Sequence, residues 1–510
     1  MSDIKIKSAL ISVYDKKGLD AIVPLLIKNK VEVYSTGGTY DYLEKLGIQP
    51  LKVGDLTGYP SILGGRVKTL HPKVFGGILA KREEDHLNQL EQYSIPAIDL
   101  VVVDLYPFED TLRATEEEAQ IIEKIDIGGI SLIRAAAKNY RHVLTIASKE
   151  KYGQLEQILS NKDGVSDLEE RKSLAAHAFA VSSHYDTAIF NYFNSQLDQP
   201  LDQFRYSVQQ SNPLRYGENP HQSASYHGDW SELFSKLSGK DLSYNNLVDI
   251  DAAIQIMSEF RDAAPTFAIL KHTNACGLAT RGTCLEAWKD ALAGDPVSAF
   301  GGILIANKKI DIATAEEINK LFYEVLIAPG FDEEALVLLT KKKKRILLLL
   351  KDYPQGHTQF KSLLNGMIRQ DIDRRTESVS DLKTVSEAEP SNNQMLDLLF
   401  ANKIAKHLKS NTIVLVKNAQ LLGMGCGQTS RVDACKQAIE KAGRMGFKLE
   451  GAVMASDAFF PFPDCVELAH DAGIQAVIQP GGSINDQLSI DFCDKHNMTM
   501  VTTGVRHFKH

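Results

Sequence analysis

The sequence predicts an α/β protein that begins with a doubly wound parallel sheet. Residues 100–103 and 143–146 are continuous apolar runs, which are typical of strands buried on both faces of such a sheet. Residues 17–28 instead carry apolar side chains at helical spacing. Strand and helix patterns of these two kinds alternate through the N-terminal region, and this alternation favours helices packed on both faces of the sheet.

The elements of the N-terminal region follow in a regular order. Residues 8–13 and 31–34 are predicted strands, with the helix 17–28 between them. A short helix is expected over residues 40–46, where Gly47 ends it. Residues 196–203 are polar, contain a proline and follow a helical pattern, so they predict a domain boundary.

Two further α/β regions are expected after this boundary. One ends on the apolar strand 346–350, and the other begins near residue 394. The polar stretch 369–394 is expected to be a long exposed connection. In the last region strands are expected at residues 412–416, 452–455, 476–478 and 498–502. We therefore predict domains at residues 1–199, 200–365 and 366–510. The sequence alone does not show whether the last two are related.

The composition is ordinary for a globular protein with several cores. The chain has 510 residues, of which 44% are hydrophobic and 24% charged, and its formal net charge is −8. This acidic balance argues against a nucleic-acid-binding protein, which would need a basic surface. The basic run 341–345 is therefore expected to be a solvated turn.

The cysteines and the termini indicate a compartment. The six cysteines form neither a C-x-x-C pair nor a Cys/His group with zinc-ligand spacing, so reduced thiols and no metal site are expected. Residues 1–7 lack a signal-peptide core, and the apolar run 346–350 is far too short to span a bilayer. The sequence thus predicts a cytoplasmic protein without membrane contact.

Lys271 and His272 stand at the end of the apolar run 267–270, before a Gly-containing turn. In α/β proteins ligands bind at the edge of the sheet where strands end. A lysine can stabilise a developing oxyanion, and a histidine can exchange a proton near neutral pH. A Lys-His pair is most often an ordinary surface pair, and only the other motifs of the chain give it weight.

Two glycine-containing motifs in the N-terminal region suggest an anionic substrate. Residues 35–39, Ser-Thr-Gly-Gly-Thr, follow a strand and open a helix, where backbone N–H groups can approach a phosphate. Residues 64–72, Gly-Gly-Arg-Val-Lys-Thr-Leu-His-Pro, set two cations and a hydroxyl beside a Gly-Gly turn. A tight turn is the simpler interpretation of either motif alone.

Two more motifs in this region supply acid–base groups. Residues 104–108 close an apolar strand, so Tyr106 is expected at the edge of the sheet. Residues 125–129 open a helix and bring Asp126 to its start. Although each motif alone is more typical of turns and solvated helix faces, their combination in one domain favours an anionic-substrate site with Lys, Tyr and Asp.

The rest of the chain carries comparable motifs. Residues 214–222 pack Arg, Tyr, Asn and His into one short stretch, residues 295–302 form a loop before a strand, and residues 425–431 combine glycines with one Arg. Residues 456–464 place three Phe between two carboxylates. An exposed aromatic loop of this kind either stacks on a flat ligand or packs against the protein's own core, and the sequence leaves both open.

Together these segments resemble a known family. The motifs at residues 64–72, 214–217, 271–274, 428–431 and 456–462 are similar, in this order, to those of the bifunctional purine-biosynthesis family that joins AICAR transformylase to IMP cyclohydrolase. The resemblance covers nearly the whole chain and is weak over residues 331–395.

The resemblance implies a fold, an assembly and a set of substrates. The implied fold is a methylglyoxal-synthase-like doubly wound domain followed by two cytidine-deaminase-like α/β subdomains. The implied assembly is a homodimer whose transformylase sites lie between the chains. The implied ligands are AICAR, formyl-AICAR, IMP and folate, with 10-formyltetrahydrofolate as the formyl donor and without a catalytic metal.

The resemblance also implies site residues. For the cyclohydrolase it implies catalytic roles for Lys68, Tyr106, Asp126 and Lys138, and for formyl transfer it implies Lys271, His272 and Asn411. The implied substrate-binding residues are Ser12, Lys16, Ser35, Gly37, Gly38, Thr39, Arg66, Thr69 and Gly128, followed by Arg215, Tyr216, Asn246, Phe300, Gly301, Glu324, Arg431, Phe459, Asp464 and Arg506.

These residue types suit the implied chemistry. The amine of AICAR is a weak nucleophile, because its lone pair is drawn into the ring and the carboxamide. A base, His272, and a cation for the tetrahedral oxyanion, Lys271, would both assist its attack. Ring closure would use Asp126 as the base, with Lys68 and Tyr106 on the oxygen.

Two alternatives remain open from the sequence. A non-catalytic nucleotide-binding protein of this fold is expected to lack Lys68, Lys271 or His272, all of which are present. A monofunctional transformylase with an inactive N-terminal domain is favoured only by Asp104, which stands where the family commonly has Asn.

Overall fold

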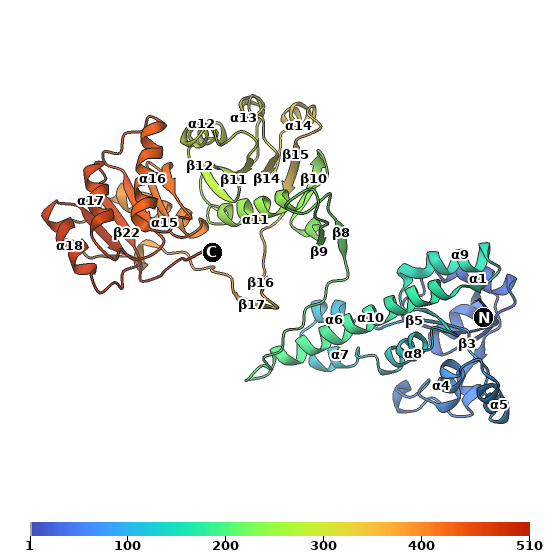
Figure 1. The fold of residues 1–510 in the computed structure, drawn as a ribbon. Helices are drawn as coiled ribbons and strands as arrows, with labels where there is room; N and C mark the ends of the chain where they lie inside the picture. Colours follow the sequence, from blue (N-terminus) through green and yellow to red (C-terminus); the bar gives the residue numbers. More distant parts are fainter. Residues whose placement is uncertain (1–2) are drawn as a thin grey trace. The chain divides into compact units, whose positions relative to one another are not determined.

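The computed structural model describes residues 3–510 and divides into two compact units, Met1–Gln209 and Gln210–His510 (Figure 1). We expected the first domain to end at residue 199. The following residues instead stay with the first unit: Asn194 Oδ1 accepts a hydrogen bond of 2.7 Å from Leu201 N, and Ser207 Oγ lies 3.0 Å from His184 Nδ1.

The first unit is built on a five-stranded parallel sheet with the strand order β4-β3-β2-β5-β6. Its strands are β2 (Ser8–Val13), β3 (Glu32–Ser35), β4 (Leu51–Lys52), β5 (Leu100–Asp104) and β6 (Leu144–Ile146). The central strands β2 and β5 are almost wholly buried, as their apolar runs predict. The predicted doubly wound α/β fold is therefore confirmed for this unit.

Helices cover both faces of this sheet (Figure 1). Ala9 and Ile11 of β2 pack with α1 (Leu19–Lys28) and α9 (Tyr152–Asn161), whereas Leu10 packs with the helices on the other face. These other helices are α4 (Pro72–Leu79), α8 (Ile127–Lys138) and α10 (Leu168–Ser195). Because successive side chains of a strand alternate between faces, one short strand supplies two cores.

The remaining elements of the first unit are short or peripheral. The helices are α2 (Gly37–Lys45), α3 (Val53–Thr57), α5 (Glu84–Gln92), α6 (Phe108–Ala114) and α7 (Glu118–Ile122), with 3₁₀ turns at Leu63–Gly65 and Lys149–Lys151. The strands β1 (Ile4–Lys5) and β7 (Val165–Ser166) pair with each other. Helix α2 starts at Gly37, three residues before the start we expected, so the Gly-Gly pair forms its first turn.

The second unit contains one twelve-stranded mixed sheet, in the order β10-β15-β14-β13-β11-β12-β20-β19-β21-β22-β23-β18. Its first half comprises α11 (Tyr244–Ser258), β11 (Thr266–Lys271), β12 (Asn274–Thr280), α12 (Cys284–Gly294), β13 (Ile303–Ala306), α13 (Ile312–Ile318), β14 (Val325–Ala328), α14 (Glu333–Thr340) and β15 (Ile346–Leu350). Its second half comprises α15 (Asn392–His407), β19 (Ile413–Lys417), β20 (Gln420–Gly425), α16 (Arg431–Arg444), β21 (Val453–Ser456), α17 (Asp464–Asp471), β22 (Ala476–Gln479), α18 (Asp486–Lys495) and β23 (Thr499–Thr502).

The two halves repeat the same order of elements. Each has a helix, an antiparallel hairpin, a second helix, and then three parallel strands separated by helices. The halves meet where β12 runs antiparallel to β20, with Ala279 opposite Gln420. The structure thus answers what the sequence left open, because the second and third α/β regions share one topology and one sheet.

Smaller elements complete the second unit. They are β8 (Ser211–Pro213), β9 (Ser225–His227), β10 (Phe234–Ser238), β16 (Thr358–Leu363), β17 (Gly366–Asp371) and β18 (Lys383–Thr384), with 3₁₀ turns at Trp230–Glu232 and Val379–Asp381. The predicted division at 365/366 falls in the turn between β16 and β17, which pair with each other. This division remains a prediction.

The expectation that residues 369–394 form an exposed connection is wrong in part. Strand β18 in this stretch pairs with β23, and Glu377 is only 5% exposed. The Glu377 carboxylate accepts a hydrogen bond from Asn402 Nδ2 and lies 3.2 Å from His507 Nε2, so a polar sequence is buried here through specific partners. Within residues 3–510, no helix has the length and apolar character needed to cross a membrane.

Close helix–strand packing in both halves depends on a glycine. A side chain at Gly277 of β12 would overlap the carbonyl group of Ala291 in α12, and one at Gly423 of β20 would overlap Ala438 O in α16. We expect Gly277→Ala to destabilise the protein by about 1–3 kcal/mol, because the helix must move away from the sheet. Thermal unfolding measures this loss. Gly356→Ala is the matched control, since a Cβ there has no neighbour within 4 Å, and an equal effect of the two changes would contradict the interpretation.

Candidate functional site

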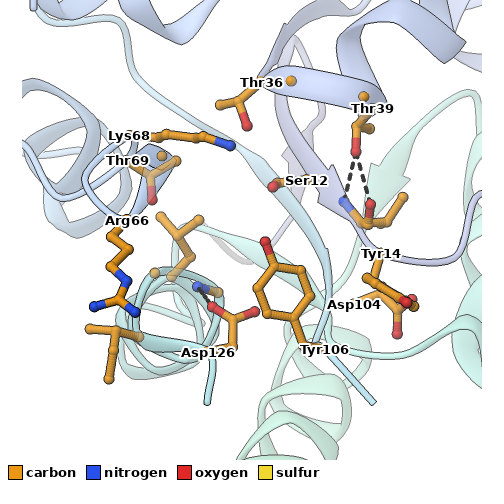
Figure 2. A pocket seen from close by; sticks show the side chains of 18 of the residues that line it. Ser12, Tyr14, Thr36, Thr39, Arg66, Lys68, Thr69, Asp104, Tyr106 and Asp126 are labelled. Carbon is orange, nitrogen blue, oxygen red and sulfur yellow. Dashed lines mark hydrogen bonds between the residues drawn. The ribbon is translucent and has the colours of Figure 1, made fainter. Parts of the chain in front are cut away.

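The first unit holds a cavity of about 460 Å³ at the carboxyl ends of its parallel strands (Figure 2). Its walls come from the end of β2, the start of α2, the loop before α4, the segment after β5 and the start of α8. This is the edge at which α/β sheets bind ligands, and the volume suits a small molecule. Figure 2 shows Lys68, Ser12 and Tyr106 turned toward a common space above Asp126.

One side of the cavity is suited to an anion. Helix α2 begins here with Gly37, and no side chain caps its first turn. The ammonium groups of Lys68 and Lys16 lie 3.6 and 3.9 Å from the points where side chains at Gly37 and Gly38 would begin. A helix N-terminus with free N–H groups and two nearby lysines attracts a phosphate, and glycine leaves room for it.

The opposite side of the cavity carries a carboxylate and a phenol. Asp126 caps α8, and its Oδ1 accepts a hydrogen bond of 2.6 Å from Gly129 N. Burial raises the pKa of Asp126 above its ordinary value even though this cap favours the charged form. Burial, together with the charges of Asp126 and Glu123, likewise raises the pKa of Tyr106. Asp126 is therefore a stronger base than an exposed aspartate.

Most residues expected in this domain line the cavity. They are Ser12, Lys16, Gly37, Gly38, Thr39, Arg66, Lys68, Thr69, Tyr106, Asp126 and Gly128. Arg66 forms an ion pair with Glu123, which also lines the cavity. The hydroxyl of Thr39 is bonded to the backbone of Val13, so its role is to hold α2 against β2.

Two expected residues lie elsewhere. Ser35 is fully buried, and its hydroxyl donates a hydrogen bond of 2.8 Å to Ile11 O between adjacent strands. Lys138 is in the last turn of α8, whereas Asp126 caps the first turn. At 1.5 Å per residue, Asp126 and Lys138 are roughly 18 Å apart along the helix, and Lys138 is not among the residues that line the cavity.

The sequence prediction missed Tyr14, Thr36 and Gly129, which also line the cavity. The ring of Tyr14 packs edge-on against Tyr106, with 5.5 Å between centroids, and Lys124 Nζ lies over both rings. Tyr14 follows the end of a predicted strand, so its position at the edge of the sheet could have indicated it.

Asp104, the departure from the family pattern, is also a wall of the cavity. Its Oδ2 accepts a hydrogen bond of 2.9 Å from Asp15 N. Burial raises the pKa of Asp104, and its charge contributes to the raised pKa of Asp126. An asparagine could accept the same hydrogen bond without that charge.

In the second unit, Lys271 and His272 lie where β11 ends and turns into β12. The strand ends on this side of the sheet form what we call the edge of the second unit. Lys271 Nζ donates a hydrogen bond of 2.6 Å to Phe300 O, which leaves two of its three protons for a ligand. A side chain at Gly301 would start only 3.1 Å from this nitrogen. His272 is exposed, and Phe300 is 60% exposed.

Asn411 lies near this hairpin because β12 and β20 are neighbours in the sheet. Cys426 follows the end of β20, and its Sγ lies 3.3 Å from Oδ1 of Asn274 in the hairpin. Gln428 lies two residues after Cys426, and its backbone oxygen accepts hydrogen bonds from both N and Nδ2 of Asn411. The structure thus brings Lys271, His272 and Asn411 to one edge, although they are far apart in the sequence.

Arg431 belongs to the same edge but is not free. Its guanidinium donates to Ser456 Oγ and to Asp457 Oδ1, each at 2.8 Å, and its side chain is 9% exposed. Arg506 lies next to His507, whose N–H donates to Asp457 O. These contacts gather the C-terminal motif residues around Asp457.

The other expected residues occupy varied positions. Arg215 stacks on Tyr216 and is exposed, Asn246 forms a capping box with Ser243 at the start of α11, and Glu324 forms an ion pair with Lys240. Asp464 is the first residue of α17. In the aromatic loop 456–464, Phe460 packs in the protein's own core, whereas Phe459 and Phe462 are 38% and 56% exposed and are free to stack on a ligand.

The two groups of residues suit different chemistry. The cavity of the first unit combines a group of residues suited to an anion with a half-buried carboxylate, and the edge of the second unit combines a lysine with a histidine. Across residues 3–510, no cluster of three or more His, Cys, Asp or Glu side chains is placed to hold a metal ion.

Known proteins resemble the chain along its whole length. A family model described as "AICARFT/IMPCHase bienzyme" matches residues 136–441, and one described as "MGS-like domain" matches residues 18–131. A bifunctional purine biosynthesis protein PurH from Bacteroides thetaiotaomicron is 59% identical over 512 residues, covering 100% of both chains. A protein of the same name from Acetivibrio thermocellus is 46% identical over 522 residues, covering 99% of this chain and 100% of the relative.

Proposed function

This chain belongs to the AICARFT/IMPCHase bienzyme family, and from this premise we propose how its two units divide the work. It is a bifunctional enzyme of IMP synthesis. It transfers a formyl group to AICAR in a folate-dependent reaction and closes the ring of the product, formyl-AICAR, to give IMP. The full-length similarity to PurH proteins carries this conclusion.

We assign ring closure to the cavity of the first unit. The phosphate of formyl-AICAR would bind at the N-terminus of α2, between Lys16 and Lys68. Asp126 would take a proton from the carboxamide nitrogen as that nitrogen attacks the formyl carbon. Lys68 and Tyr106 would stabilise the resulting oxyanion. This oxygen would take up the proton held by Asp126 and a second proton from the formamido N–H, and it would leave as water as the C=N bond of the ring forms. The raised pKa of Asp126 supports its role as the base.

We assign formyl transfer to the edge of the second unit. The donor would be 10-formyltetrahydrofolate. His272 would take a proton from the amine of AICAR as it attacks the formyl carbon, and Lys271 would stabilise the tetrahedral oxyanion. When this intermediate collapses, the tetrahydrofolate nitrogen leaves and takes up a proton. Asn411 would orient the substrates, and no step in this scheme requires a metal.

The remaining motif residues would bind the nucleotide and the folate. Exposed Arg215 is suited to a phosphate, and exposed Phe300 and Phe459 are suited to stacking on flat rings. Asp464 and Arg506 are further candidates for the same site. For Lys138 and Ser35, only the resemblance to the family supports a role in the site. The six free cysteines support a reducing compartment, and we propose the cytoplasm.

We propose that the enzyme is a homodimer and that the hairpin of β16 and β17 contributes to its interface. All residues of both strands are exposed, including Phe360, Met367 and Ile368. An isolated two-stranded hairpin is marginally stable in water, and exposed apolar side chains favour an interface. A second copy of this chain would cover it.

The first prediction concerns formyl transfer. His272→Ala should lower its rate by about 10²–10⁴-fold, the usual contribution of a positioned base. Cyclisation of supplied formyl-AICAR should be unchanged, because that reaction is assigned to the other unit. Incubation with AICAR and 10-formyltetrahydrofolate, following folate release and IMP separately, measures both activities. A protein that releases folate and never forms IMP would favour a monofunctional transformylase.

The second prediction concerns the pH dependence of cyclisation. Asp126 acts as a base only when it is ionised, and its pKa is raised. On acidification, cyclisation should therefore be lost at a higher pH than if the base had the pKa of an ordinary aspartate. Asp104→Asn should move this acid limb to lower pH, because it removes a negative charge that raises the pKa of Asp126. Asp110→Asn on the surface is the control. An unmoved limb in Asp104→Asn would refute the assignment.

The third prediction concerns the dimer. Introducing charge through Phe360→Asp and Ile368→Asp should produce monomers in sedimentation and reduce formyl transfer, while cyclisation persists. Lys361→Ala, on the same exposed hairpin, is the control and should stay dimeric. If the doubly substituted protein remains a dimer, the hairpin is not the interface.

A further inference from the structure

The two hairpins of the repeated halves have the same turn geometry. Each joins its strands through two residues, His272–Thr273 in one half and Asn418–Ala419 in the other. All four residues have a positive φ, of 49°, 65°, 52° and 53° respectively. This is the left-handed pair that a type I′ turn requires, for which Asn-Gly is the preferred sequence.

The supports of the two hairpins also correspond. Lys271 Nζ donates to Phe300 O at 2.6 Å, and Lys417 Nζ donates to Glu450 O at the same distance. In each half the accepting residue precedes a glycine of positive φ, Gly301 at 70° and Gly451 at 73°. The lysine at the strand end is therefore part of the shared scaffold, and the clearest chemical difference at the turn is His272 in place of Asn418.

A carboxylate from the preceding helix holds each turn. Asp249 of α11 accepts a hydrogen bond of 2.9 Å from Thr273 N. Asp397 of α15 accepts from both Asn418 N and Ala419 N, each at 2.7 Å. The same device thus recurs under a hairpin that carries a histidine and under one that does not.

The His272–Thr273 turn has the greater need of this support. Left-handed backbone is a clear outlier for a β-branched residue, and Thr273 is the residue whose N–H Asp249 holds. Ala419, at the corresponding position of the other turn, is not β-branched, so the same conformation strains it less. Burial raises the pKa of Asp249, and the charges of His272 and Lys271 oppose this, so the carboxylate lies within their field.

We propose that Asp249 is a positioning residue for formyl transfer, which holds the His272–Thr273 turn in its left-handed form and thereby keeps the His272 imidazole beside Lys271. This inference rests on the proposed role of His272 as the base. It adds a residue that touches neither substrate and acts only through the backbone of the turn.

The test compares matched variants of the two halves in the full-length enzyme. Asp249→Ala should lower kcat for formyl transfer on the order of 10²-fold, as expected for a misplaced catalytic group. The KM for AICAR and the cyclisation rate should change little. Asp249→Asn should restore much of kcat, because its carboxamide oxygen can accept the same hydrogen bond. Asp397→Ala should leave kcat per folded chain unchanged, and thermal unfolding of each variant gives the folded fraction.

A double variant separates this proposal from the one it rests on. If Asp249 acts through His272, Asp249→Ala should cause no further loss in a His272→Ala background. An additional loss as large as in the wild type would overturn the positioning role, as would equal losses in Asp249→Ala and Asp397→Ala. A fully active His272→Ala enzyme would overturn both proposals. Full activity of Asp249→Ala beside an inactive His272→Ala would overturn only this one.

Discussion

The second unit depends on one junction, the antiparallel approach of β12 and β20, which makes two repeated halves into a single sheet. Ala279 lies opposite Gln420, and Arg281 strengthens the contact by donating to Asn418 O at 2.7 Å and to Gln420 Oε1 at 3.1 Å. This junction places the turn after β11 beside the end of β20. Without it, Asn411 of the second half would not lie near the Lys271–His272 pair of the first half.

Regular elements of the fold could be predicted from local patterns. The strand 8–13 is predicted with the bounds that β2 has, because its mostly apolar residues suit a strand buried on both faces of a parallel sheet. The start of α2 was misplaced because glycines disfavour helices, although here they leave space at the end of a helix that faces a cavity. The burial of Glu377 could not be predicted, because its partners Asn402 and His507 are distant in the sequence.

The candidate sites were predictable to the extent that they consist of motifs. The loop containing Lys68, the strand end at Tyr106 and the helix start at Asp126 are each recognisable locally, and the structure brings them to one cavity. Ser35 shows the limit of this reasoning, since its hydroxyl bonds to the neighbouring strand and only the sheet register reveals it. Asp249 shows a second limit, because its role follows from comparing two halves whose similarity the sequence does not display.

Asp126 both caps helix α8 and lines the cavity. Its basicity therefore depends on whether a ligand fills the cavity. The cap favours the carboxylate and burial disfavours it, and burial prevails. If formyl-AICAR binds in this cavity, as proposed, it displaces water, and the carboxylate of Asp126 loses further hydration. Under the proposed assignment, Asp126 is therefore the stronger base once the substrate is bound, and a better hydrated and weaker base before that.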